Sequence, residues 1–155
     1  MSFNKLRYFL ILLTSLFSHF SYSAGKNISY PDEEWSFSSL FGTFDKASAQ
    51  RGFQVYKEVC AGCHGMRLVS YRNLSSLGYN NDELKAISAQ FEVMDGPNDD
   101  GEMFSRPGRP SDKFADPYPN KQSARAANGG AYPPDLSLII KARPNGANYL
   151  NALLN

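Results

Sequence analysis

Two cysteines and a histidine lie together in the first half of the sequence and are the residues best suited to chemistry. Cys60 and Cys63 are separated by two residues, and His64 follows directly. On a helical turn this spacing lets two thiols bond the two vinyl groups of one haem, and the histidine then faces the iron from the same side. The motif therefore predicts one covalently attached haem c, held by Cys60 and Cys63, with His64 as an axial iron ligand.

The same residues allow other interpretations. A structural zinc site needs about four Cys or His ligands. The mature chain would offer only three, because the other histidine, His19, lies in an apolar N-terminal run with the features of a cleaved signal. A thioredoxin-like dithiol needs a βαβ setting, whereas the residues before Cys60 predict a helix. A zinc site, a dithiol and a simple disulfide remain alternatives to haem.

The N-terminal residues 1–23 have the features of a secretory signal. Lys5 and Arg7 precede an apolar run over residues 8–20, and small residues follow it. The run is shorter than the ~20 residues that span a bilayer, and it lacks the Arg-rich character of a mitochondrial presequence. We therefore expect a haem domain at residues 24–155 that is exported to a bacterial periplasm, where c-type haem is attached.

The apolar pattern predicts an all-α domain with long loops rich in proline and glycine. One helix should begin after Asp45 and run into Cys60. A second should begin at Asn80 and end at residues 96–97, with an apolar stripe that consists of Leu84, Ile87, Phe91 and Met94. Residues 96–134 hold most of the nine prolines, yet their aromatic residues favour an ordered, packed loop.

Shorter elements complete this expectation. The aromatic residues between positions 24 and 44 should pack onto the body as an extended lead-in segment. Pro133 and Pro134 should open a short helix, because proline suits the first turn, and its buried side should consist of Leu136, Ile139 and Ile140. Tyr149 begins a further helical stripe. The net charge of +1 says nothing about partners by itself, and no nucleic-acid partner is expected.

Several longer motifs resemble the cytochrome c1 family, and the resemblance extends from about residue 35 to the C-terminus. They are SLFGTFDK at 39–46, RGFQVYKEVC at 51–60, RLVSYRNL at 67–74, DGPNDDGEMF at 95–104 and GAYPPDLS at 130–137. The resemblance implies a cytochrome c-like haem domain that serves as the haem c subunit of the cytochrome bc1 complex. Such a subunit sits beside cytochrome b on the periplasmic face of the bacterial inner membrane. It takes one electron from the Rieske iron–sulfur protein and passes it to a soluble cytochrome c.

The resemblance also implies roles for individual residues. It supports haem attachment at Cys60 and Cys63 with His64 on the iron, and it adds four haem contacts, at Asn128, Pro134, Arg143 and Tyr149. Arg143 has independent support, because a guanidinium matches a haem propionate in bidentate geometry. The plainer alternatives are a basic residue near a helix end for Arg143, a loop turn for Asn128 and core packing for Tyr149.

An acidic stretch follows the second predicted helix. Asp95, Asp99, Asp100 and Glu102 lie there with no basic residue between them. Such a patch would attract a basic cytochrome c and speed encounter, so these four acids are candidate docking residues. The alternative is a solvated loop.

The sequence departs from the family pattern at its C-terminal end. The resemblance implies a downstream methionine as the second iron ligand, a helix that packs on the first one, and a membrane anchor. None of these is present, so we expect a chain incomplete at this end, associated with the membrane through the complex or a missing anchor. Met66, Met94 and Met103 are poor substitutes for the ligand. The competing hypotheses are a soluble mono-haem protein with an open distal site, for ligand sensing or peroxide reduction, and a non-functional fragment.

Overall fold

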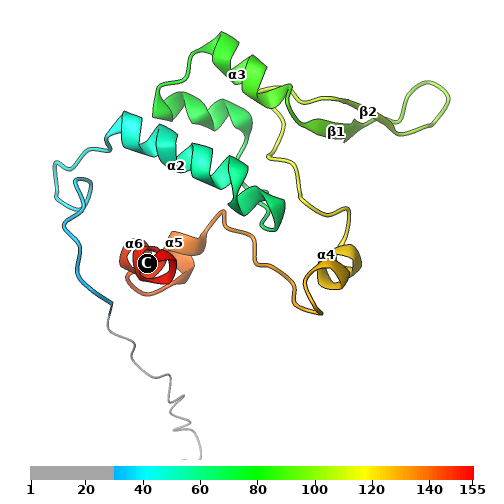
Figure 1. Ribbon diagram of the computed structural model, residues 1–155. Coiled ribbons are helices and arrows are strands. Elements are labelled where there is room, and N and C mark those ends of the chain that lie inside the picture. The colour runs from blue at the N-terminus through cyan, green and yellow to red at the C-terminus, as the bar shows by residue number, and fades with distance from the viewer. Residues whose placement is uncertain (1–29) are drawn as a thin grey trace, which may run out of the picture.

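The computed structural model describes residues 30–155 (Figure 1), so the predicted signal at residues 1–23 lies outside the described part. Helices dominate the described chain, and one small sheet accompanies them. In chain order the elements are α2 (Lys46–Glu58), η1 (Cys60–Gly62), η2 (Tyr71–Leu77), α3 (Asn81–Ser88), β1 (Glu92–Asp95), β2 (Phe104–Pro107), α4 (Lys121–Ala127), α5 (Ile139–Ala142) and α6 (Gly146–Leu154).

Helix α2 leads the chain into the cysteine motif. Asp45 caps this helix as predicted, because its carboxylate accepts hydrogen bonds from the backbone N–H groups of Ala47 (3.3 Å) and Ser48 (3.0 Å). The helix ends at Glu58, and the single turn η1 follows with Cys60 as its first residue. The capped start of α2 therefore determines where the motif is presented.

The hydrophobic core lies where α2, η2 and α3 meet the proline-rich segment. The ring of Phe114, which comes from that segment, lies 4.7 Å from the ring of Tyr71 between centroids. Phe53 and Tyr56 on α2 pack against the same ring, at 5.9 and 5.7 Å. The prediction that the proline-rich segment is ordered and packed is confirmed at this point. The buried cluster consists of Tyr71, Leu74, Leu84 and Phe114.

The second predicted helix is shorter than expected. Asn80 and Glu83 form the predicted capping box, since each side chain accepts a hydrogen bond from the other residue's backbone N–H. The helix α3 then ends at Ser88 and does not continue to Met94. Met94 lies on β1 and is 62% exposed, which corrects the expectation that it belongs to a buried helical stripe.

The strands β1 and β2 form an antiparallel hairpin that projects from the helical body (Figure 1). Along β1 exposed and half-buried side chains alternate, which is the period of a strand and not of a helix. On β2 Arg106 forms ion pairs with Asp95 at the end of β1 and with Asp112 beyond the hairpin, the latter at 2.7 Å. These contacts with Arg106 hold the pKa of both carboxyl groups below their ordinary value. The structure thus departs from the all-α expectation by one small two-stranded sheet, which the sequence did not predict.

Residues 133–138 do not form the helix that the two prolines predict. Helix α5 begins only at Ile139, and Ile140 is exposed instead of buried. The reason is a contact with a distant segment: the backbone N–H of Leu136 donates to the carbonyl of Gly65 at 2.9 Å, which holds these residues against the cysteine motif.

Helix α6 packs against the lead-in segment. The indole N–H of Trp35 donates to the side-chain oxygen of Asn148 at 2.7 Å, and the rings of Trp35 and Phe37 stack with centroids 5.6 Å apart. Leu40 and Phe41, in contrast, are 92% and 90% exposed. Only the first part of the aromatic lead-in therefore packs onto the body as predicted.

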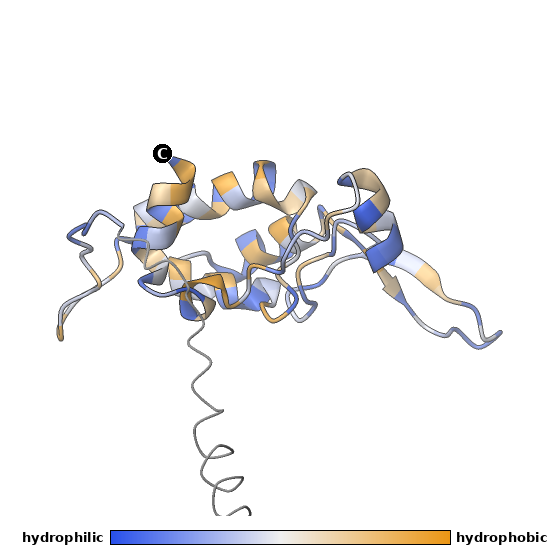
Figure 2. Ribbon diagram, turned by 90° about the horizontal axis from the view of Figure 1, so that it is seen from below, coloured by the Kyte–Doolittle hydropathy of each residue, from blue (hydrophilic) through white to orange (hydrophobic). Residues whose placement is uncertain are grey.

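Helix α6 ends in an apolar turn. Leu153 and Leu154 are exposed there, and Figure 2 shows this apolar end beside the mark of the C-terminus. Across residues 30–155 no helix combines the length and the apolar character that a membrane crossing requires.

Candidate haem-binding site

The cysteine motif is folded into a single tight turn. The backbone carbonyl of Cys60 accepts hydrogen bonds from the N–H groups of Cys63 (3.1 Å) and His64 (2.9 Å). Both thiols are free, and Cys63 is exposed. Among the described residues no cluster of three or more His, Cys, Asp or Glu side chains is arranged to hold a metal ion. The turn presents two unpaired thiols and the histidine from one short segment, which fits the donor set that covalent haem requires.

The ring of His64 is oriented by a backbone carbonyl. Its Nδ1 lies 2.8 Å from the carbonyl oxygen of Pro134. A carbonyl can only accept, so Nδ1 carries the proton and donates, which leaves the Nε2 lone pair available for iron. Metal-bound histidines typically donate their other N–H to such a group. Pro134, expected beside the haem, is thus placed against the predicted iron ligand.

The segment that carries Pro134 is joined to the motif by further hydrogen bonds. The backbone N–H of Arg67 donates to Asp135 Oδ2 at 2.9 Å, and that of Leu68 donates to Ser137 Oγ at 3.0 Å. Together with the bond from Leu136 to Gly65, they hold residues 134–137 beside residues 64–68. No periodicity in the sequence signals this contact, because it joins two irregular segments far apart in the chain.

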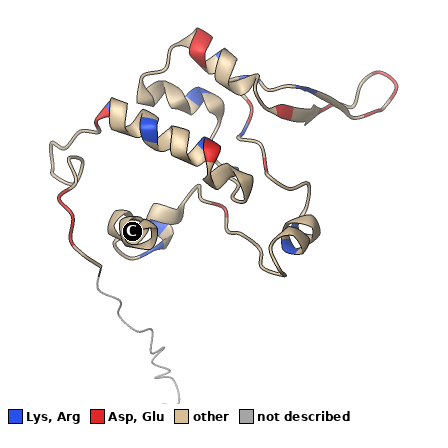
Figure 3. Cartoon of the chain, in the orientation of Figure 1, with Lys and Arg blue, Asp and Glu red and all other residues tan. Residues whose placement is uncertain are grey.

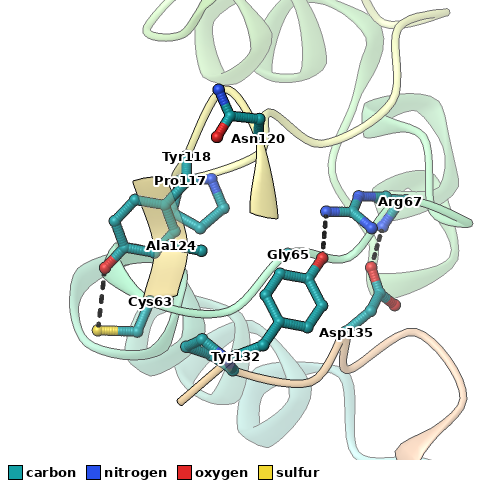
Figure 4. Close-up of a pocket in the computed structure, with 10 residues that line it drawn as sticks. Cys63, Gly65, Arg67, Pro117, Tyr118, Asn120, Ala124, Tyr132 and Asp135 are labelled. Carbon is teal, nitrogen blue, oxygen red and sulfur yellow. Dashed lines mark hydrogen bonds between the residues drawn. The ribbon is translucent and has the colours of Figure 1, made fainter. Parts of the chain in front are cut away.

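Tyr118 lies beside Cys63 at a small pocket that Tyr132 and Asp135 also line (Figure 4). The hydroxyl of Tyr118 lies 3.9 Å from Cys63 Sγ, a long and weak contact. The amide of Asn128 donates to that hydroxyl at 3.1 Å and to the carbonyl of Ala124 at 2.7 Å. Asn128 is therefore linked to the second cysteine through Tyr118, a residue that sequence reasoning did not single out.

Charged groups surround Gly65, directly after His64. Arg67 forms an ion pair with Asp116 at 2.8 Å and donates to the hydroxyl of Tyr132 at 3.0 Å (Figure 4 shows the latter). The hydrogen bond to Asp116 raises the pKa of Arg67 above its ordinary value. A Cβ on Gly65 would lie 2.5 Å from Asp116 Oδ1, so a larger residue here would force the Asp116 side chain to shift.

Both carboxylate oxygens of Asp135 accept hydrogen bonds from backbone N–H groups. Burial acts to raise the pKa of Asp135, but the hydrogen bonds that it accepts from Arg67 and Ser137 outweigh this effect and hold the pKa below its ordinary value. Asp135 is therefore an anion at neutral pH, next to the predicted iron ligand.

Arg143 and Tyr149 contact each other across the junction of α5 and α6. The guanidinium carbon of Arg143 lies 5.6 Å from the ring centroid of Tyr149, within cation–π range. The ring of Tyr30 meets Tyr149 edge-on at 5.6 Å. The structure brings these two predicted haem contacts together as a pair, while Pro134 contacts His64 directly and Asn128 reaches Cys63 only through Tyr118.

The predicted docking acids separate into two groups. Asp95, the last residue of β1, is paired with Arg106, so it is not a free charge of the predicted patch. Asp99, Asp100 and Glu102 are exposed in the loop between β1 and β2. Figure 3 shows this red loop at the tip of the projecting hairpin. The acidic surface is therefore the loop tip and does not include Asp95.

The methionines expected to be poor iron ligands either pack at the core or are open to solvent. Met66 packs at the edge of the buried core. Met103, in the hairpin loop, is 56% exposed.

Comparison with known proteins identifies relatives over most of the chain. “Cytochrome c1-2, heme protein, mitochondrial” of Solanum tuberosum is 59% identical over 80% of this chain and 48% of its own length. Cytochrome c1 of Rhodospirillum rubrum is 52% identical over 82% of this chain and 47% of its own. Cytochrome c1 of Saccharomyces cerevisiae is 49% identical over 80% and 40%. The chain spans about half the length of these relatives, or less.

A model of the cytochrome C1 family matches residues 35–155. Proteins of this family carry a covalently bound haem c. The motifs around Cys60 and Pro134 that suggested the resemblance both lie within the matched residues. On this match and these identities, the chain belongs to the cytochrome c1 family.

Proposed function

We propose that this chain binds one haem c through Cys60 and Cys63, with His64 on the iron, and transfers single electrons as a subunit of a cytochrome bc1 complex. It receives the electron from the Rieske iron–sulfur protein and gives it to a soluble cytochrome c. The observation that carries the proposal is the hydrogen bond of 2.8 Å between His64 Nδ1 and the carbonyl of Pro134. His64 directly follows a motif whose two thiols are free.

The protein's own part in this function is to hold the ligand and the ring rigidly. The bound haem supplies the one-electron couple of its iron. The Pro134 carbonyl fixes the tautomer and the direction of the His64 ring, and it makes Nε2 a stronger donor. Because α2 is capped at its start and packed on Phe114, we expect the motif to stay in place when the haem iron is oxidised or reduced.

The remaining predicted contacts fit the edge of such a haem. Arg143 offers a guanidinium suited to a propionate, and the ring of Tyr149 beneath it limits its rotamers. Asn128 uses its amide to hold Tyr118, so its contribution is to keep that ring against Cys63. In this proposal the junction of α5 and α6 supplies the positive charge of Arg143 for a haem propionate. The end of α4 supplies Asn128, which holds the Tyr118 ring in place.

The acidic loop is the proposed docking surface for the acceptor. Asp99, Asp100 and Glu102 project from the body and would attract a basic cytochrome c over a distance of about one Debye length, ~8–10 Å at physiological salt. The complex places the domain on the periplasmic face of a bacterial inner membrane, held by cytochrome b and the Rieske protein or by an anchor of its own. The signal features of residues 1–23 support this location.

Rapid-mixing kinetics of the haem-loaded chain test the proposal. Reduced Rieske protein should reduce it within the mixing experiment, and oxidised soluble cytochrome c should reoxidise it, at a rate that falls as salt rises. A chain that binds carbon monoxide or peroxide but accepts no electron from the Rieske protein would contradict the proposal.

Charge variants test the docking surface separately. The pair Asp99→Asn and Asp100→Asn should slow the reaction with cytochrome c at low salt and flatten its salt dependence. The matched control is Glu33→Gln with Glu34→Gln, which removes two charges from the lead-in segment at the opposite end of the molecule (Figure 3). Equal slowing by both pairs would show that net charge matters and that the loop is not a docking surface.

A further inference from the structure

Asp135 joins the two segments that meet at the His64 ring. Its Oδ2 accepts from the backbone N–H of Arg67 at 2.9 Å, on the motif side. Its Oδ1 accepts from the backbone N–H of Ser137 at 2.8 Å, on its own side. Both carboxylate oxygens are thus used to hold backbone, and neither hydrogen bond depends on a flexible partner side chain.

The residue next to Asp135 presents the carbonyl that His64 uses. Pro133 and Pro134 have restricted φ angles, which stiffen the chain before this carbonyl. After it, Asp135 and the bond from Leu136 to Gly65 (2.9 Å) anchor the chain to the motif. The position of the Pro134 oxygen is therefore determined on both sides, by ring geometry and by the Asp135 carboxylate.

We infer that Asp135 is a positioning residue for the axial histidine: by holding the Pro134 carbonyl against His64 Nδ1, it sets how strongly His64 donates to iron. The inference rests on the proposed haem attachment. A well-aligned Nδ1–H···O bond gives the imidazole anionic character, which strengthens the Nε2–iron bond and favours ferric iron. A misplaced carbonyl would weaken that bond and raise the midpoint potential.

Asp116 provides a matched control at nearly the same place. A Cβ built on Gly65 would lie 2.5 Å from Asp116 Oδ1 and 3.4 Å from Asp135 Oδ2, so both carboxylates flank the residue after His64. Asp116 accepts its hydrogen bonds from the side chain of Arg67, at 2.9 and 2.8 Å. It contributes a similar negative charge without holding the segment of Pro134.

The test measures two properties of the haem-loaded chain. One is the midpoint potential, which responds both to nearby charge and to the histidine bond. The other is the iron–histidine stretching frequency, recorded by resonance Raman after photolysis of carbon monoxide from the reduced protein, which reports the strength of the Nδ1 hydrogen bond. Asp135→Ala should lower the stretching frequency and raise the potential. Asp116→Asn should raise the potential and leave the frequency unchanged.

Two results would overturn the inference. One is an iron–histidine stretching frequency in Asp135→Ala that equals the wild-type value. The other is a fall of this frequency in Asp116→Asn as large as in Asp135→Ala, which would show that the effect comes from the lost negative charge. If Asp135→Ala accumulates no holoprotein, Asp135→Asn carries the test: it retains one acceptor oxygen, so a smaller fall is expected, and no fall refutes the idea. Absence of covalent haem from the wild-type chain would instead refute the proposed function.

Discussion

Replacing Asn148 with alanine should lower the free energy of unfolding by about 2 kcal/mol. Asn148 is only 5% exposed on α6. Its Oδ1 accepts from the indole N–H of Trp35 at 2.7 Å and, at a weak 3.4 Å, from the backbone N–H of Glu33. Its Nδ2 donates to the carboxylate of Asp32 at 3.0 Å. One side chain therefore connects α6 to the lead-in segment.

The magnitude follows from what each partner loses. The indole N–H of the half-buried Trp35 is left without its acceptor, which costs about 1–2 kcal/mol. The bond to the exposed Asp32 can be replaced by water and contributes about 0.5 kcal/mol net. The long contact with Glu33 adds little. The sum is about 2 kcal/mol, and most of it comes from Trp35.

Urea unfolding of the haem-loaded chain measures this change. Trp35 is the chain's single tryptophan, so its fluorescence reports the loss of the contact directly. The control is Asn151→Ala, which removes an exposed bond to Glu33 of 3.2 Å and should cost less than about 0.5 kcal/mol. In a Trp35→Phe background, where unfolding is followed by far-UV circular dichroism because the tryptophan signal is gone, Asn148→Ala should cost much less. An equal cost in both backgrounds would refute the assignment to the indole contact.

Three further predictions concern acid stability, iron coordination and export. Because Arg106 lowers the pKa of Asp112 in the folded state, the stability from this pair is present above the ordinary Asp value of 3.8 and is lost as pH falls below it; Arg106→Gln should flatten this acid loss in urea unfolding. The polypeptide of this sequence made alone should have five-coordinate or water-ligated iron that binds carbon monoxide or imidazole; a methionine-to-iron absorption band abolished by Met94→Leu or Met103→Leu would contradict this. Deletion of residues 1–23 should leave a cytoplasmic, haem-free polypeptide, and holoprotein in the cytoplasm would disprove the signal.

The sequence predicted the elements whose contacts are local. The cap at Asp45 and the capping box of Asn80 and Glu83 depend on residues within one turn, and both are confirmed. The helix expected from Asp45 to Cys60 is also present as α2, with Phe53 and Tyr56 on its packed face, because helical periodicity is strong over a segment of this length.

The failures occur where distant segments decide the structure. Met94 falls in register with a helical stripe, but pairing with β2 and the hydrogen bond from Gly108 to Phe91 (2.8 Å) draw this stretch into a hairpin. A short apolar stretch fits both periods, so the pattern alone could not decide. Pro134 was predicted to open a helix, whereas contacts with residues 64–68 hold it extended.

The same limit applies to the candidate site. The motif itself identifies Cys60, Cys63 and His64, because chemistry imposes their spacing. Tyr118 and Asp135 reach the motif through hydrogen bonds between irregular segments, for which no sequence period exists. Such residues become visible only when the backbone positions are known.

The most direct test of the account is the state of haem on the exported protein. Intact-mass spectrometry after acid–organic extraction should show the polypeptide plus one haem, because two thioether bonds at Cys60 and Cys63 survive this treatment. The double variant Cys60→Ser and Cys63→Ser should give the bare polypeptide mass from the same extraction. Bare polypeptide mass for the wild-type protein, or haem retained by the double variant, would contradict covalent attachment at this motif.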